Sequence, residues 1–155
     1  MKRLIGLGLF LAFFALPPVQ AQEMEVSALD ARPASVGSSD YFTGTAIIEP
    51  LFNPNEAARA SAARVQFAPG ARSAWHSHPR GQRLVVTSGR GWVKRRDGER
   101  RTIEPGDVIW TPPGVEHWHG ATTSHAMSHI AIQEARDSSV VNWMGPVSDD
   151  EYQPE

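Results

Sequence analysis

Two stretches of the sequence decide the fold: residues 70–89, GARSAWHSHPRGQRLVVTSG, and residues 106–120, GDVIWTPPGVEHWHG. Each contains two histidines separated by one residue: His76 and His78, then His117 and His119. On a β-strand, residues two apart project from the same face at a spacing of about 7 Å, so each pair can converge on one ion. Glycines beside each pair predict tight turns between the strands.

These histidines, with a side-chain oxygen from Gln82, have the composition of a metal site. Three imidazoles, out of the four in these pairs, and one oxygen would be typical ligands of a first-row divalent ion that keeps open coordination positions. A single histidine is more often a surface or core residue than a ligand. Two such pairs on strands, in a chain with six histidines, favour a metal site that both stretches build together.

Short strands are predicted throughout the rest of the chain. With 13 glycines and 12 prolines in 155 residues, turns are favoured over long helices. Alternating or β-branched segments predict strands at residues 41–49, 63–67, 83–88, 91–96, 99–103, 107–111, 115–120 and 126–133, and a short one near 24–28. Pro50 is expected to end the first of these, and Asp97-Gly98 predicts a hairpin. The expected fold is all-β, an antiparallel sandwich or barrel.

The N-terminus is typical of a secretory signal peptide over residues 1–21. Lys2 and Arg3 precede a run of thirteen mostly apolar residues, and Ala21 offers a cleavage site. A bilayer span needs about 20 residues, so a permanent membrane helix is the weaker alternative. We expect an exported protein, periplasmic or secreted, with a flexible arm at residues 22–40 and a single domain at 41–155. Outside the cytoplasm, zinc would compete for the metal site.

The charge balance argues against nucleic acid as a partner. Fifteen basic and seventeen acidic residues give a net charge of −2, which provides no basic footprint. Eight basic residues do cluster: Arg80, Arg83, Arg90, Lys94, Arg95, Arg96, Arg100 and Arg101. We interpret them as protection of an exposed hairpin edge. A small-molecule substrate is expected, with no stable membrane insertion after signal cleavage. Without cysteine, stability must come from a core or a metal.

The two stretches resemble the paired motifs of the cupins. The first motif is glycine, five residues, His-x-His, three or four residues, glutamate, six residues and glycine, and its places are filled by Gly70, His76, His78, Gln82 and Gly89. The second is glycine, five residues, Pro-x-Gly, two residues, histidine, three residues and asparagine, and its places are filled by Gly106, Pro112, Gly114, His117 and Ala121. This resemblance implies a small jelly-roll β-barrel with a metal inside.

Gln82 and Ala121 depart from the general cupin pattern, in the glutamate and asparagine places respectively. With glutamine, the ligand set is neutral and the metal keeps its full charge, which makes it a stronger Lewis acid. The glutamine could also mark a lost metal site, although an amide oxygen is a competent ligand for a hard ion. Alanine in the asparagine place is expected to affect only a turn.

A narrower resemblance, spanning roughly residues 41–152, is to the bacterial cupin hydroxynitrile lyases of the (R)-mandelonitrile lyase type. It rests on residues 41–45, 75–82, 117–120 and 127–135. It implies manganese held by His76, His78, His117 and Gln82, and a pocket that includes His119 and His129 with Gln133 nearby. Zinc or iron remain possible metals.

Strand parity also places His129 and Gln133 on the same face as Met127 and Ala131. We expect His129 to be the base that removes the hydroxyl proton of a cyanohydrin, unless it only orients a ligand. His119 or Gln133 would orient the substrate or stabilise departing cyanide. Part of an apolar aryl pocket is expected from Ala63, Val65 and Phe67.

Two other functions remain open, a metal-dependent cupin dioxygenase and a non-catalytic periplasmic binding barrel. Trp75 and Trp118 have outward parity beside the ligands. They suggest a second buried surface and hence a homo-oligomer, a dimer or tetramer, although packing against a neighbouring loop of the same chain would explain them equally well.

Overall fold

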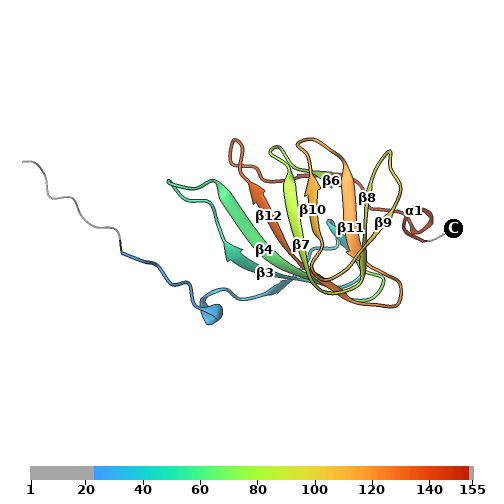
Figure 1. Ribbon diagram of the computed structural model, residues 1–155, viewed down its shortest axis with the longest axis horizontal. Coiled ribbons are helices and arrows are strands. Elements are labelled where there is room, and N and C mark those ends of the chain that lie inside the picture. The colour runs from blue at the N-terminus through green and yellow to red at the C-terminus, as the bar shows by residue number, and fades with distance from the viewer. Residues whose placement is uncertain (1–22, 154–155) are drawn as a thin grey trace, which may run out of the picture.

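The computed structural model describes residues 23–153, which form two antiparallel sheets wrapped into a jelly-roll barrel (Figure 1). The all-β fold expected from the sequence is confirmed. No helix within residues 23–153 is long and apolar enough to cross a membrane. The expected signal peptide at residues 1–21 lies outside the described residues.

The first sheet, sheet A, has the strand order β1-β3-β4-β12-β7-β10. Its strands are β1 (Ser35–Val36), β3 (Ala46–Phe52), β4 (Ala60–Phe67), β12 (Met127–Glu134), β7 (Gln82–Gly89) and β10 (Val108–Thr111). The long pairings β3–β4, β4–β12 and β12–β7 are all antiparallel. They make sheet A the larger continuous wall of the barrel.

The second sheet, sheet B, carries the short histidine-bearing strands. Its main path is β13 (Asn142–Trp143), β6 (His76–Ser77), β11 (His117–Ala121), β5 (Arg72–Ser73) and β2 (Phe42–Thr43). β8 (Gly91–Arg95) pairs with β11 and with β9 (Arg101–Ile103), which confirms the hairpin predicted around Asp97-Gly98. The two helical turns are η1 (Leu29–Ala31) and α1 (Asp149–Tyr152).

Two local expectations were wrong. β3 continues through Pro50 instead of ending before it, and the ladder to β4 is irregular between Pro50 and Phe52. A proline, which lacks an N–H, is tolerated where a ladder is already interrupted. No strand forms at residues 24–28. The sheet begins at Ser35, within the arm expected at residues 22–40, because Ser35 and Val36 pair with β3. Residues 23–34 project away from the barrel (Figure 1).

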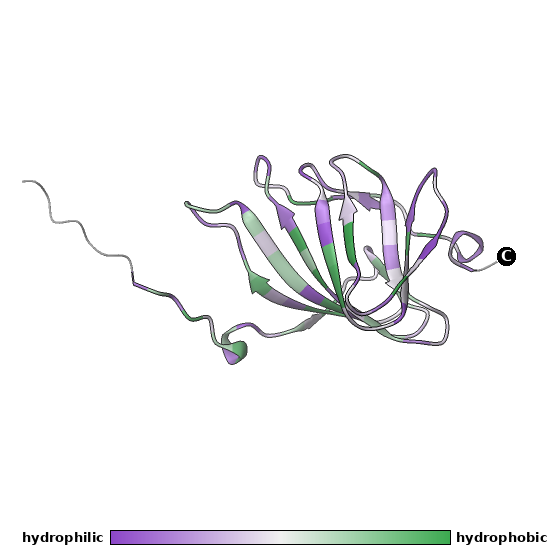
Figure 2. Cartoon of the chain, viewed as in Figure 1, coloured by the Kyte–Doolittle hydropathy of each residue, from purple (hydrophilic) through white to green (hydrophobic). Residues whose placement is uncertain are grey.

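The core lies between the sheets, toward one end of the barrel. Phe67, Val86, Ile103 and Met127 form its centre and are at most 4% exposed. In Figure 2, β7 and β12 are apolar over their lower parts and polar toward their upper ends, where Gln82 pairs with Gln133. The polar side chains of the interior therefore gather at one end of the barrel.

The outer face of sheet B is covered by the C-terminal segment of the same chain. Trp75 and Trp118 are buried against Val147 and Tyr152. The Tyr152 hydroxyl donates to the carbonyl of Ala121 at 2.8 Å. The outward tryptophans are thus explained by packing within the chain, and they give no support to a second buried surface between subunits.

We predict that Gly89→Ala destabilises the protein much more than Gly70→Ala. Both glycines have positive φ, +75° and +81°, so alanine at either site costs about 1 kcal/mol of backbone strain. A Cβ at Gly89 would also overlap the Ala126 carbonyl, whereas a Cβ at Gly70 would have no atom within 4 Å. Overpacking adds about 1–3 kcal/mol. Urea unfolding of both variants measures the difference, and equal losses would contradict the argument.

Candidate metal centre and its cavity

The pairing of β6 with β11 brings the two histidine stretches together. His76 and His117 lie directly opposite each other in the ladder, and their ring centroids are 4.3 Å apart. The ring of His78 is 5.1 Å from His76 and 5.5 Å from His117. Gln82 begins β7 on the facing sheet, with its Oε1 3.2 Å from Nε2 of His117. The four side chains predicted to meet are close together and buried.

Three of these histidines are oriented by main-chain carbonyls. Nδ1 of His76 lies 2.9 Å from the carbonyl oxygen of Ala74. Nδ1 of His78 lies 2.6 Å from that of Val140, and Nδ1 of His117 lies 3.0 Å from that of Val115. A carbonyl only accepts, so Nδ1 carries the proton and Nε2 keeps its lone pair. This tautomer, fixed by a backbone oxygen, is the one that metal-bound histidines use.

The free nitrogens and oxygen of this cluster suit a divalent cation. Nε2 of His78 is buried without a hydrogen-bond partner in the described chain. Nε2 of His117 faces Oε1 of Gln82, so two electron-rich atoms lie opposite each other with no proton between them. A shared cation stabilises such an arrangement. The residues present therefore fit a metal ion.

Among the described residues, the set whose ligand atoms lie close enough to one another to share an ion contains His119 in place of His78. One ring nitrogen from each of His76, His117 and His119 lies within 4.8 Å of the others. The environment of His119 differs, because its Nδ1 contacts Nε2 of His129 at 3.1 Å and no carbonyl. Nε2 of His119 and Nδ1 of His129 have no partner in residues 23–153. His119 thus forms a pair with His129 beside the three carbonyl-anchored rings.

All five of these histidines are held neutral. Burial is the main cause: it lowers the pKa of His117 to about 4 and that of His129 to about 3. It also lowers the pKa of His78 and, together with neighbouring histidines, holds the pKa of His76 and His119 well below the usual value. Neutral imidazole is the form that binds metal or accepts a proton, so the cluster is prepared for both roles at pH 7.

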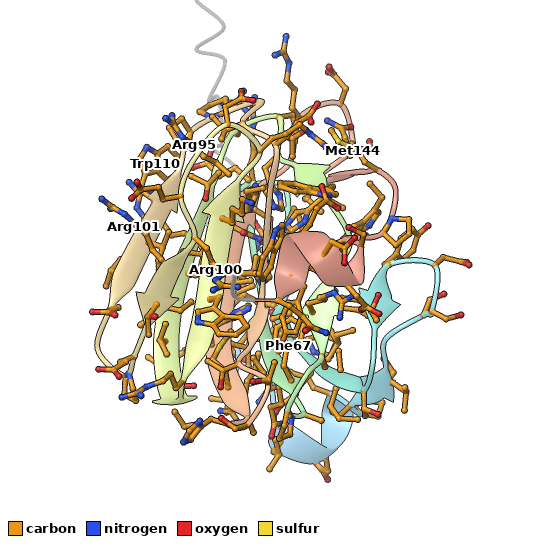
Figure 3. All side chains as sticks on the ribbon, turned by 90° about the vertical axis from the view of Figure 1, so that its right-hand side faces the viewer. Phe67, Arg95, Arg100, Arg101, Trp110 and Met144 are labelled. Carbon is orange, nitrogen blue, oxygen red and sulfur yellow. The ribbon has the colours of Figure 1, made fainter. Side chains whose placement is uncertain are left out.

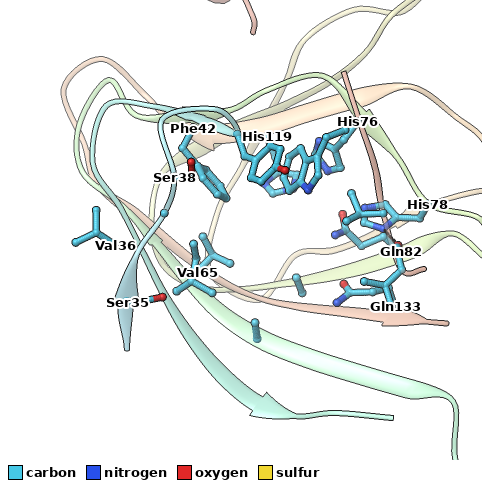
Figure 4. Close-up of a pocket in the computed structure, with 18 residues that line it drawn as sticks. Ser35, Val36, Ser38, Phe42, Val65, His76, His78, Gln82, His119 and Gln133 are labelled. Carbon is cyan, nitrogen blue, oxygen red and sulfur yellow. Dashed lines mark hydrogen bonds between the residues drawn. The ribbon is translucent and has the colours of Figure 1, made fainter. Parts of the chain in front are cut away.

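A cavity of about 330 Å³ opens onto this cluster. Figure 4 shows His76, His78 and Gln82 along one end and Val36 with Ser35 at the other. His119 lines the cavity, as does Gln133, whose amide donates to Oγ of Ser61 at 3.1 Å. The walls are mostly apolar, so the space suits an organic molecule whose polar group reaches the histidines.

The predicted pocket residues occupy different depths. Ala63 and Val65 line the cavity, whereas Phe67 lies beyond it. The Phe67 ring packs on His119 and His129, with centroid distances of 5.8 and 5.7 Å. His129 is fully buried and does not line the cavity, so it reaches that space only through His119. This placement differs from the expected direct role of His129 as base.

Both ends of the domain supply cavity walls that sequence reasoning missed. Residues 35–38, with Tyr41 and Phe42, come from the N-terminal side, and Val140, Val141 and Trp143 come from the C-terminal side. Trp143 stacks on Tyr41 at 4.7 Å and lies 4.9 Å from the ring of His76. These segments are too short and irregular to show a strand period; the aromatic residues Tyr41, Phe42 and Trp143 were the only available signal.

Comparisons with known proteins agree with this architecture. A family model described as a cupin domain matches residues 63–132. An (R)-mandelonitrile lyase from Granulicella tundricola is 48% identical over 129 residues, covering 83% of this chain and 98% of that protein. Both motifs, with His76, His78, Gln82 and His117, lie inside residues 63–132, and Gln133 follows directly after that range.

Solved structures give the same result. A cupin-like protein from Thermotoga maritima is 41% identical, with a TM-score of 0.71 over 76% of this chain and 90% of the other. A polyketide cyclase from Streptomyces resistomycificus shares the fold at 17% identity, with a TM-score of 0.66 over 84% of this chain and 91% of the other. This chain is therefore a member of the cupin family, as shown by its two facing sheets, its paired histidine stretches and its extended match to named relatives.

Proposed function

We propose that this protein is a metal-dependent lyase that cleaves aromatic cyanohydrins, of the (R)-mandelonitrile kind, to an aldehyde and hydrogen cyanide. One observation carries the proposal: an apolar cavity ends at neutral histidines, and one of them, His119, has a buried Nε2 without a partner in the described chain. The 48% identical relative named (R)-mandelonitrile lyase supports the choice of reaction.

We assign the metal ligands to His76, His78, His117 and Gln82. The carbonyl-anchored tautomers of the three histidines support this set over one that includes His119. Manganese is the proposed ion by resemblance, with zinc or iron as alternatives. When bound, the ion would supply a Lewis acid that polarises the hydroxyl oxygen of the cyanohydrin.

The protein's own base is proposed to be His119, with His129 as its positioning residue. If Nδ1 of His119 donates to Nε2 of His129, Nε2 of His119 has a free lone pair beside the cavity. That nitrogen accepts the hydroxyl proton as the C–CN bond breaks and the electron pair leaves with cyanide. Returning the proton to cyanide gives hydrogen cyanide and regenerates neutral His119.

The remaining cavity residues are proposed to hold the two ends of the substrate. The Gln133 amide, fixed by Ser61, would orient the departing cyanide. Ala63 and Val65 have small side chains that leave room for an aryl ring, and Trp143 offers an aromatic wall for it. Export to the periplasm or medium remains part of the proposal on sequence grounds. A homo-oligomeric state also remains a proposal, but the tryptophans that suggested it are covered by Val147 and Tyr152 of the same chain.

The reaction itself is tested with purified protein whose metal content has been measured. Mandelonitrile should yield benzaldehyde, followed by its ultraviolet absorbance, without oxygen uptake. Oxygen consumption with catechol or a flavonol would instead indicate the dioxygenase. Metal-loaded protein that is inert toward all of these substrates would favour a binding barrel.

The two histidines should respond differently to replacement. His119→Ala removes the proton acceptor, so kcat should fall about 10²- to 10⁴-fold while the metal stays bound. His129→Ala leaves the acceptor in place but unoriented, so the fall should be about 10- to 100-fold. It should also change the pH dependence of kcat/KM. Greater loss in His129→Ala, or loss of metal in either variant, would refute these roles.

Metal should be retained well below the pH at which free imidazole protonates. Burial lowers the pKa of His117 to about 4, so the neutral, metal-binding ring persists as pH falls through 6.5 and is lost only near pH 4. Elemental analysis after gel filtration should find bound metal at pH 5 and little at pH 4. Complete release by pH 6 would contradict a buried site.

The same pKa shifts predict the behaviour of the metal-free protein. Between about pH 6.5 and 4 these histidines are protonated in the unfolded chain but neutral in the folded one. The free energy of unfolding therefore decreases as pH falls through this range. Metal-free protein should therefore have a lower urea midpoint at pH 5 than at pH 7.

A further inference from the structure

The basic cluster at residues 80–101 divides into groups with and without partners. Most members form an ion pair or stack on a ring: Arg80 with Glu134, Arg83 on Trp110, Arg90 with Glu104, Arg96 with Glu116 and Arg100 on Trp92. Within residues 23–153, Lys94, Arg95 and Arg101 have neither kind of partner. These three residues are therefore the members of the cluster whose charge is not already engaged by a neighbour in the described chain.

The strand register separates these three residues by face. Arg95 pairs with His117 in the β8–β11 ladder, and Arg101 pairs with Val93 in the β8–β9 ladder. Val93 in turn pairs with His119. Directly opposed residues share a face, so Arg95 and Arg101 lie on the same face of sheet B as the histidines, but both are exposed. Lys94 pairs with the outward-facing Trp118 and lies on the other face.

A second cavity, of about 570 Å³, lies at these two arginines. It is lined by His117, which does not line the first cavity, and by Val93, Ile109 and Val115. It therefore combines two guanidinium groups with an apolar surface next to a proposed metal ligand. Figure 3 shows Arg95, Arg101 and Trp110 on one side of the molecule.

The acidic groups of this cavity leave the arginines available. Asp97 and Glu99 also line it, on the β8–β9 connection, but neither forms an ion pair with Arg95 or Arg101. Gly98 lets the Arg95 side chain fold beneath this turn, because a Cβ there would lie 2.7 Å from Nε of Arg95. Arg95 and Arg101 are both exposed, so an external anion can reach their guanidinium groups.

We propose that Arg95 and Arg101 form a binding site for the carboxylate of a small organic acid. Guanidinium groups bind carboxylates through two parallel hydrogen bonds, which gives the site a geometric preference for that group. The apolar body of the acid would pack on Val93, Ile109 and Val115. The site is separate from the cavity proposed for the cyanohydrin and does not depend on lyase activity.

Calorimetric titration of metal-loaded protein with benzoate tests the site. Benzoate should bind, and the double variant R95Q/R101Q should bind it at least tenfold more weakly. K94Q removes the same charge from the opposite face of β8, so its affinity should stay within twofold of the original. If the double variant does not fold, the single variant R101Q replaces it in the titration. Its loss of benzoate affinity should be smaller than that expected for R95Q/R101Q. Unchanged affinity in R95Q/R101Q or R101Q, or equal loss in K94Q, would overturn the proposal.

Three comparisons locate the bound molecule and define its chemistry. Ala63→Leu fills the first cavity, so benzoate affinity should be unchanged; a large loss would place the benzoate beside the metal instead. Benzyl alcohol, which has the ring without the charge, should not bind. Inorganic phosphate should bind more weakly than benzoate, because it lacks the apolar body. Equal binding of phosphate or of benzyl alcohol would refute an organic acid as the ligand.

Discussion

The site depends on burying five neutral imidazoles next to one another. Neutral rings can be packed inside a barrel without the large cost of buried charge, and burial in turn keeps them neutral. The three carbonyl-anchored rings gain a fixed tautomer from Ala74, Val115 and Val140. Main-chain oxygens thus decide which nitrogen of each ring is available, and the chemistry of the cavity follows from that choice.

This constraint gives different roles to chemically identical side chains. His117 and His119 are two residues apart on β11, yet one donates to a carbonyl and the other contacts a histidine. On this difference rests the proposal that His117 is a metal ligand and His119 a base. Sequence spacing places both rings on one face, but only their hydrogen-bond partners distinguish them.

Much of the fold was predictable because strand patterns and turn residues are local. The alternation around Val65, the hairpin at Asp97-Gly98 and the strand before Pro112 all appear as expected. The depth of a side chain within the barrel depends instead on contacts between segments that are far apart in the sequence. Parity places Phe67 and His129 on the inner face correctly, but it cannot show that both lie behind His119. The outward tryptophans were equally ambiguous, because what covers them is the distant segment around Tyr152.

The cavity walls and the metal cluster come from different parts of the chain. The histidines belong to the middle of the sequence, whereas much of the wall comes from residues 35–42 and 140–143 near its ends. The links between the parts are largely main-chain groups that any amino acid supplies: the carbonyl of Val140 contacts His78, and the β13–β6 pairing sets Trp143 opposite His76. Mutations in these terminal segments can therefore reshape substrate choice while the reactive centre persists, which lets a lineage acquire new specificities on an unchanged scaffold.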